Sequence, residues 1–392
     1  MDTTLDQEEL MVRETARKFL EAECPTRLVR EMETDEKGYP PALWKKAADL
    51  GWQGMVLPEE YGGGGMPLTY LGLILEEMGR ALAPLPLLST SVAALTLARA
   101  GSEEQKASVL AAVSSGDMVL TWAFSETDPR FLPETVKTRA EKAGEGFVIN
   151  GTKLFVENFL AADRALVACR TAPAATDGAG LSLFLLDTKT PGISERPLTT
   201  LAKDKVSEVV FRDVRVPGSS LVGELHEGGP IVERLLEEAT VLLCAQMLGA
   251  TRKDFEMAVE YAKFRKAFGQ PIGAFQSIWH LSADMLMWID GGELLTYEAL
   301  WKLDQGLPAA TEVSQAKAFC NEKCEAVVRL GQTIHGGIGF MMEFDLHLWY
   351  RRVCAWTMRL GTSYEHRSRI AGALLDHPGR VILGRPVPVV PE

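Results

Sequence analysis

The stretch Val119-Leu120-Thr121-Trp122-Ala123-Phe124 marks the point where the pattern of the chain changes. It is a short run of aliphatic, aromatic and β-branched residues, which favour extended strands. Further runs of this type follow, separated by turn residues, at 146–151, 165–168, 181–186 and 208–211. This spacing predicts a compact, mostly antiparallel β domain.

On both sides of this β region the apolar residues have helical spacing. Before it, Ser102 and Gln105 frame a stretch typical of a capped helix start. After it, one long helix is expected from residue 229, with further helices over 271–304, 311–333 and 342–376. The tail from Pro386 is proline-rich and is expected to be loop. The fold class is therefore α+β, with a helical N-terminal domain (1–118), a central antiparallel β domain (119–228) and a helical C-terminal domain (229–392).

Composition and charge exclude several classes of protein. A formal net charge of −12 argues against nucleic acid or an anionic membrane surface as a partner. No run approaches the roughly 20 apolar residues that cross a bilayer. The N-terminus is acidic and lacks an apolar or basic leader, so we expect a soluble, cytoplasmic protein.

The cysteines and histidines show no metal-binding pattern. The six cysteines are scattered without a CxxC pair, and Cys320 and Cys324 have helical spacing. We expect free, mostly buried thiols and no metal. An anionic ligand would have to be bound by local basic residues and backbone amides, against the overall charge.

Four motifs follow one another along the chain. They are Gly51-Trp52-x-Gly54-Met55-x-x-Pro58-Glu59-Glu60-Tyr61-Gly62-Gly63, then Phe211-x-Asp213-Val214-x-Val216-Pro217, then Tyr261-x-x-x-Arg265-x-x-Phe268-Gly269-x-x-Ile272-x-x-Phe275-Gln276, and last His335-Gly336-Gly337-x-Gly339-Phe340 with Gly361-Thr362. Together they resemble the acyl-CoA dehydrogenase superfamily over nearly the whole chain. The resemblance implies a C-terminal four-helix bundle, FAD as cofactor and an acyl-CoA thioester as substrate.

The resemblance also implies an oligomer. Arg265 supplies a planar, permanently charged fork suited to a pyrophosphate, and in the family the equivalent arginine reaches the FAD of a neighbouring subunit. A homo- or hetero-tetramer is expected, and an electron-transfer flavoprotein is one candidate electron acceptor. Outside the middle domain, the residues that the resemblance places at the cofactor are Arg265, Phe268, Phe275, Gln276, Thr333, Gly336, Gly337 and Thr362.

The middle domain is expected to hold the flavin ring. By resemblance, Trp122, Phe124 and Ser125 lie on a strand that contacts the flavin, and Phe155 stands where the family has an aromatic residue against the ring. Glu157 replaces the Thr or Ser that bonds the reactive flavin nitrogen. An ionised carboxylate there is costly without a partner or a proton, so we expect Glu157 to turn towards solvent.

The family's catalytic base is missing from both of its known positions. A carboxylate with a raised pKa normally removes the α-proton of the thioester. In most members it directly precedes the Gly-Thr pair, where this chain has Leu360. In others it lies ten residues before a glycine that matches Gly249, where this chain has Ala239.

Other residues near these two positions are weaker candidates. By resemblance Glu237, Thr240, Leu360 and Gly361 contact the substrate, and the Leu360 N–H can still polarise the thioester oxygen. The replacement bases considered are Glu157, Glu238, Tyr364 and Glu365, although charged pairs such as Glu237 and Glu238 are commonly solvated on a helix surface.

Three hypotheses follow. The chain is the base-less partner in a heteromeric acyl-CoA dehydrogenase, as the segment 335–352 resembles paired-subunit enzymes that act on bulky cyclic or steroid-type acyl-CoAs. Alternatively, it is an acyl-CoA dehydrogenase with a non-standard base. The third reading is a non-redox acyl-CoA lyase or decarboxylase, which needs no α-proton base.

Overall fold

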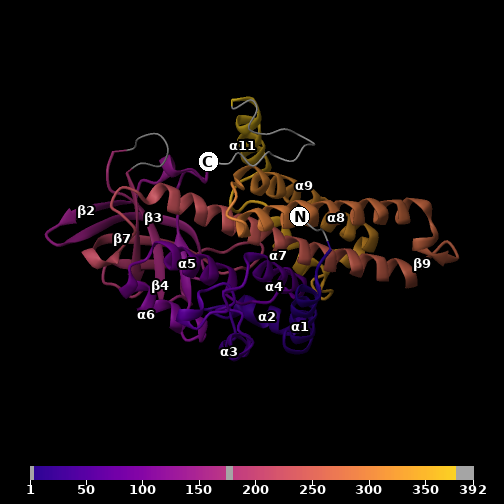
Figure 1. The fold of residues 1–392 in the computed structure, drawn as a ribbon. Helices are drawn as coiled ribbons and strands as arrows, with labels where there is room; N and C mark the ends of the chain where they lie inside the picture. Colours follow the sequence, from indigo (N-terminus) through magenta and orange to yellow (C-terminus); the bar gives the residue numbers. More distant parts are fainter. Residues whose placement is uncertain (1–3, 174–179, 377–392) are drawn as a thin grey trace.

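A computed structural model describes residues 4–173 and 180–376. The chain runs through a helical region, a β region and a second helical region, as expected (Figure 1). The predicted loop from Pro386 lies outside the described residues. The exact domain limits, at 118/119 and 228/229, stay a prediction.

The N-terminal region consists of helices around two buried ones. Helix α1 begins with a capping box between Asp6 and Glu9, and α6 begins with the one expected between Ser102 and Gln105. Helices α4 and α5 are almost wholly buried. The helices are α1 (Gln7–Glu23), α2 (Thr26–Thr34), α3 (Pro41–Asp49), α4 (Leu68–Ala81), α5 (Leu87–Ala100) and α6 (Glu103–Ser114).

The middle region is one sheet with the strand order β6-β7-β3-β2-β4-β5-β8. Strand β1 belongs to the same sheet and pairs with β4, although it has no place in this linear order. Most pairs are antiparallel, but β1 and β2 each run parallel to β4, so the domain is not purely antiparallel. The strands are β1 (Leu120–Ala123), β2 (Arg139–Ala143), β3 (Gly146–Glu157), β4 (Arg164–Arg170), β5 (Leu181–Asp187), β6 (Ile193–Pro197), β7 (Val206–Pro217) and β8 (Leu221–Val222).

The C-terminal region is a bundle of long helices, and it departs from the expected pattern at two places. The helix expected over 342–376 is two helices separated by a turn at 357–362, where Leu360 and Gly361 have φ of +58° and +101°. A β-hairpin precedes α8, so that helix begins later than predicted. The elements are α7 (Gly228–Phe264), β9 (Lys266–Ala267), β10 (Gln270–Pro271), α8 (Gln276–Asp304), α9 (Ala310–His335), α10 (Leu346–Trp356) and α11 (Ser363–Leu375).

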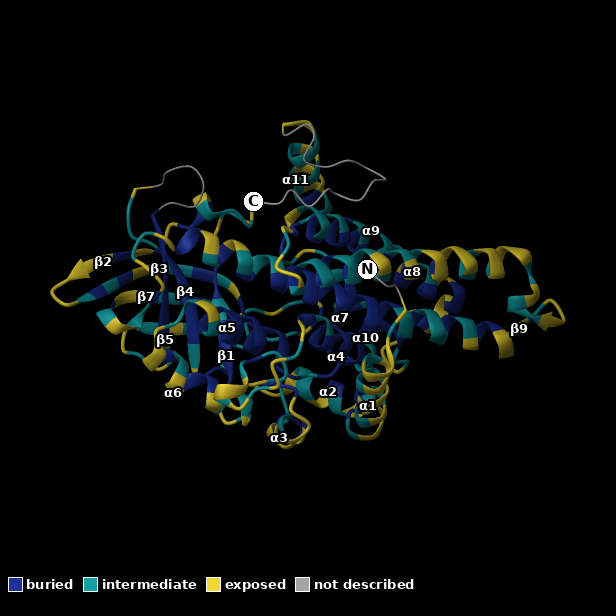
Figure 2. Cartoon of the chain, viewed as in Figure 1, coloured by how far each residue is buried: buried dark blue, intermediate teal, exposed yellow. Residues whose placement is uncertain are grey.

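One hydrophobic core joins the three regions (Figure 2). It contains residues of α4, α5, α7 and α9 together with one face of the sheet, while a second cluster fills the other face. Helices α4 and α7 pack closely, since a Cβ on Gly249 would lie 1.7 Å from the carbonyl oxygen of Glu76. The six cysteines are free, and all but Cys354 are buried, as expected.

No helix in the described part of the chain is long and apolar enough to span a membrane. Within the same residues, no group of three or more His, Cys, Asp or Glu side chains could hold a metal ion.

Candidate functional site

A cavity of about 440 Å³ opens between the sheet and the end of α10. Strands β1 and β3 form one side of it, and the turn after α10 forms the other. Its lining is largely aromatic and aliphatic. Six residues predicted from the sequence lie together on its wall: Trp122, Phe124, Ser125, Phe155, Glu157 and Leu360.

Phe155 is held on this wall in an unusual conformation. Its φ is +54°, in the left-handed region that non-glycine residues rarely adopt. Its side chain is 57% exposed although it lies on the wall of a cavity. A strained backbone that keeps a large aromatic ring uncovered is typical of a binding site. The Phe124 ring stacks on Phe131 with centroids 6.1 Å apart, so the lining of the cavity includes a pair of stacked aromatic rings.

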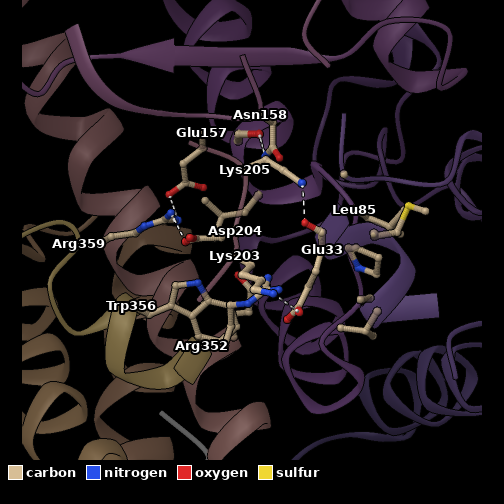
Figure 3. Close-up of a pocket in the computed structure, with 18 residues that line it drawn as sticks. Glu33, Leu85, Glu157, Asn158, Lys203, Asp204, Lys205, Arg352, Trp356 and Arg359 are labelled. Carbon is tan, nitrogen blue, oxygen red and sulfur yellow. Dashed lines mark hydrogen bonds and ion pairs between the residues drawn. The ribbon is translucent and has the colours of Figure 1, made fainter. Parts of the chain in front are cut away.

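Glu157 does not turn towards solvent, so that expectation was wrong. Its Oε1 accepts a hydrogen bond of 2.5 Å from Arg359, which also donates to Asp204 (Figure 3). The side chain of Glu157 is 24% exposed, that of Arg359 16% and that of Asp204 8%. Arg359 therefore supplies the partner that a buried carboxylate requires at this position.

The two carboxyl groups differ in acidity. Burial raises the pKa of Glu157, with the charge of Arg359 opposing the shift. Burial also acts to raise the pKa of Asp204, but Arg359 and Arg352 hold it below its usual value. Asp204 is thus a carboxylate at neutral pH and a weak base, whereas Glu157 is the more basic of the two.

The turn after α10 places Leu360 against the cavity. Leu360 is 5% exposed, and its carbonyl oxygen lies 2.8 Å from Nε2 of His366. The side-chain amide of Asn321 donates to the carbonyl oxygen of Gly361 at 3.1 Å. The N–H of Leu360 has no acceptor within residues 4–173 and 180–376, so it remains available to a ligand.

The second base position and its neighbours lie away from the cavity. Ala239 is fully buried in the core. Glu238 is also buried, and it is not a solvated surface charge: Arg99 and Arg234 donate to it at 2.5 Å and 2.8 Å. Burial raises the pKa of the half-buried Glu237. The hydroxyl of Thr240 donates to the carbonyl oxygen of Leu236.

The residues that follow the Gly-Thr pair have other roles. Glu365 closes a capping box with Thr362 at the start of α11, and it accepts from both the N–H and the hydroxyl of Thr362. Tyr364 is 80% exposed. Neither Tyr364 nor Glu365 lines the cavity.

The remaining predicted cofactor residues are not brought to this cavity within one chain. Arg265, Phe268, Phe275 and Gln276 lie on or next to the hairpin at the end of α7, at the end of the molecule opposite the sheet (Figure 1). Phe268 is 95% exposed. A second set lies at the end of α9: Thr333, Gly336 and Gly337, all exposed, with open space where a Cβ would stand on either glycine.

Sequence reasoning missed several charged residues at the site. Asp204 and Arg352 line the space behind Glu157 (Figure 3). Asp204 comes from a segment without a motif, and Arg352, which ends the segment 335–352, had no predicted role at the site. Arg359 carried one signal, because it stands directly before the position where the family has its base. Pairings between such distant residues leave no local pattern.

Comparisons with known proteins agree with this architecture. The chain matches the family models for the acyl-CoA dehydrogenase N-terminal domain over residues 6–117, the middle domain over 121–214 and the C-terminal domain over 226–375. It is 31% identical to a probable acyl-CoA dehydrogenase, YngJ, of Bacillus subtilis, over 96% of this chain and 100% of the relative.

Solved structures are similar over the same length. A variant of the steroid acyl-CoA dehydrogenase Tcur3481–Tcur3483 is 28% identical with a TM-score of 0.86, over 95% of this chain and 99% of that chain. PigA with FAD and proline is 26% identical with a TM-score of 0.89, over 95% and 99%.

Proposed function

Because the chain belongs to the acyl-CoA dehydrogenase family, whose members are FAD-dependent oxidoreductases acting on CH–CH bonds, we propose that it is the base-less subunit of a heteromeric acyl-CoA dehydrogenase. In this role it binds an acyl-CoA thioester beside FAD and completes the cofactor site of a related chain. The proposed assembly is a tetramer, and its cytoplasmic location stays an expectation from the sequence.

One observation carries the proposal. Leucine lines the cavity where the family has its glutamate, and the nearby carboxylates of Glu157 and Asp204 are both bound to Arg359. At the other base position, Ala239 lies in the core. A side chain that accepts a proton must be free to reach the substrate, and these are not.

The cavity itself fits the flavin ring. Its aromatic wall offers Trp122 and Phe155 as contacts, and the hydroxyl of Ser125 adds a polar group. Arg359 balances the charge of Glu157, so this wall carries no unpaired carboxylate. When bound, FAD supplies the acceptor for a hydride from the β-carbon. The Leu360 N–H supplies one donor to the thioester oxygen.

Exposed residues support an oligomer with shared sites. Phe268 is 95% exposed, so it offers an aromatic surface that a second chain would bury. Its ring lies edge-on to Phe275, with centroids 6.1 Å apart, and Arg265 beside it is exposed and offers a fork for a pyrophosphate. The two chains named for the steroid enzyme above give a precedent for pairing of unlike chains.

A second candidate function rests on Glu157. It lines the same cavity as Leu360, and burial raises its pKa, as a general base requires. In that reading the chain is a stand-alone dehydrogenase with Glu157 as a non-standard base, released from Arg359 when substrate binds. A non-redox acyl-CoA lyase or decarboxylase is the third candidate, and no specific side chain favours it.

Expression of the chain alone and with its genomic neighbour separates these functions. The flavin spectrum is recorded before and after addition of acyl-CoAs of different size. We expect that acyl-CoAs do not bleach any flavin that the lone chain retains. The complex with the neighbour should be yellow and active. Bleaching by the lone chain that is lost in Glu157→Gln would establish the stand-alone enzyme instead. Consumption of substrate without bleaching would indicate the non-redox reaction.

A further inference from the structure

A second cavity, of about 70 Å³, lies behind the ion pairs of Arg359 (Figure 3). It shares Glu157, Asp204 and Arg359 with the larger cavity, so the two spaces meet at these three side chains. Residues of α2, α5, α7 and α10 close the other sides. A ligand that lies along Leu360 and extends past these three side chains would reach the small cavity.

Seven charged side chains line the small cavity. Four are basic and three are carboxylates: Lys203, Lys205, Arg352 and Arg359, and Glu33, Glu157 and Asp204. Each carboxylate already has a cation. Arg359 binds Glu157 and Asp204, while Glu33 accepts from Arg351 at 2.8 Å and lies 3.9 Å from Lys203.

Arg352 differs from the other cations of this cluster. Within the described ranges 4–173 and 180–376, the guanidinium of Arg352 forms no ion pair, since no carboxylate oxygen lies within 4.0 Å of its nitrogens. Its Nε is buried without an acceptor. By contrast Lys205 donates to the carbonyl oxygens of Glu33 and Asp35, at 3.1 Å and 2.5 Å.

An unpaired guanidinium that is half-buried carries a desolvation cost. Burial lowers the pKa of Arg352, and the more distant charges of Asp204 and Glu33 offset this in part. The chain as a whole carries a net charge of −12, so an excess of cations around one cavity runs against its overall charge. A bound anion would remove the cost, and the planar fork of arginine matches a carboxylate.

We propose that Arg352 binds a carboxylate at the far end of the acyl group of an acyl-CoA ligand. This inference rests on the proposed function in one respect, namely that the larger cavity takes the acyl thioester; it does not depend on which chain carries the base. About 70 Å³ holds a carboxylate and a few waters but not a fused ring system. The ligand class is therefore an acyl-CoA with a slender, acid-terminated chain.

Titration calorimetry on the oligomer, as it purifies, tests the inference. Glutaryl-, adipyl- and suberyl-CoA are compared with pentanoyl-, hexanoyl- and octanoyl-CoA, which match them in length without the second acid. We expect at least one acid-terminated ligand to bind about 10- to 100-fold more tightly than its neutral match, the range for a charge-assisted hydrogen bond. Arg352→Met should abolish the difference, Arg352→Lys should keep part of it, and Arg212→Met, at an exposed position outside the cavity, should change nothing.

The outcomes separate this inference from the proposed function. If neutral acyl-CoAs bind and the second acid adds no Arg352-dependent affinity, the inference is overturned and the acyl-CoA function stands. If no acyl-CoA binds, the proposed function fails. Free glutarate tests whether the carboxylate can come from a free acid instead of an acyl-CoA. If glutarate alone binds and the binding depends on Arg352, the carboxylate site stands and its ligand is a free acid.

Thermal unfolding guards against a purely structural role for Arg352. The ligand-free Arg352→Met protein should unfold close to the wild-type temperature, because Arg352 forms no ion pair and the cost of its burial is offset only in part by the charges of Asp204 and Glu33. A large fall in Tm would assign Arg352 to the fold and overturn the inference.

Discussion

The imidazole Nε2 of His366 lies 2.8 Å from the carbonyl oxygen of Leu360, the residue that occupies the family's usual base position. His366 is fully buried, and burial lowers its pKa to about 3, aided by the charge of Arg369. The neutral ring therefore donates its Nε2–H to this carbonyl and holds the turn that presents Leu360.

The low pKa of His366 predicts acid sensitivity. The unfolded chain takes up a proton near pH 6.5 and the folded chain does so near pH 3, so stability is lost as pH falls through this window. The contribution approaches about 1.4 kcal/mol per pH unit. Denaturant unfolding at pH 7, 6, 5 and 4 should show a shallower loss in His366→Gln. His280→Gln, at an exposed site, should keep the wild-type slope.

Lys317 gives a second pH dependence, on the alkaline side. It is fully buried and donates to Trp356 O and Asn321 Oδ1, both at 2.8 Å. Burial lowers its pKa to about 8, so between pH 8 and 10.5 the unfolded chain holds the extra proton and stability rises with pH. Lys317→Met should flatten this rise between pH 7.5 and 9.5. Equal slopes in the variant and in the exposed control Lys18→Met would contradict the assignment.

Arg359 should be important for stability as well as for the site. Arg359→Met leaves Glu157 and Asp204 without their ion-pair partner, and breaking a buried ion pair typically costs about 3–5 kcal/mol. Adding Glu157→Gln and Asp204→Asn to it should restore much of the loss, because the unpaired charges disappear. Unfolding free energies of the single, double and triple variants measure this coupling. Additive losses would show that the three groups act independently.

Much of this arrangement is local in the sequence, and part of it is not. Helical periodicity predicted α7, and β-type runs predicted β1 and β3, since each depends on neighbouring residues. The same periodicity continues across the turn at 357–362 and concealed the break between α10 and α11. The cation cluster was invisible because its pairs join distant segments: Glu33 and Arg351 are 318 residues apart, and Asp204 and Arg359 are 155 apart.

Because Leu360 occupies the position of the family's catalytic glutamate, we expect that a glutamate placed there would accelerate the reaction. Leu360→Glu introduces a carboxylate at the cavity wall, where burial would raise its pKa towards that of a useful general base. In a chain that retains flavin, we expect bleaching by acyl-CoA to accelerate at least about 10²-fold, the lower range for general base catalysis. Leu360→Gln has nearly the same shape without the proton acceptor and should stay at the wild-type rate. Equal rates for the two variants would mean that loss of the base does not limit this chain.

The hairpin after α7 offers a test of shared cofactor binding. Phe268 is 95% exposed and adds little to the fold of its own chain, so Phe268→Ala should leave the unfolding temperature of an isolated chain unchanged. Its effect should appear only in the assembly, as a fall in FAD content and a weaker oligomer. Flavin absorbance and sedimentation measure both. Phe264→Ala, 68% exposed at the end of α7, is the matched control outside the hairpin. FAD loss without any change in assembly would place the hairpin at the cofactor of a neighbouring chain, with no contribution of Phe268 to the strength of the oligomer. Unchanged FAD content with intact assembly would give the hairpin neither role.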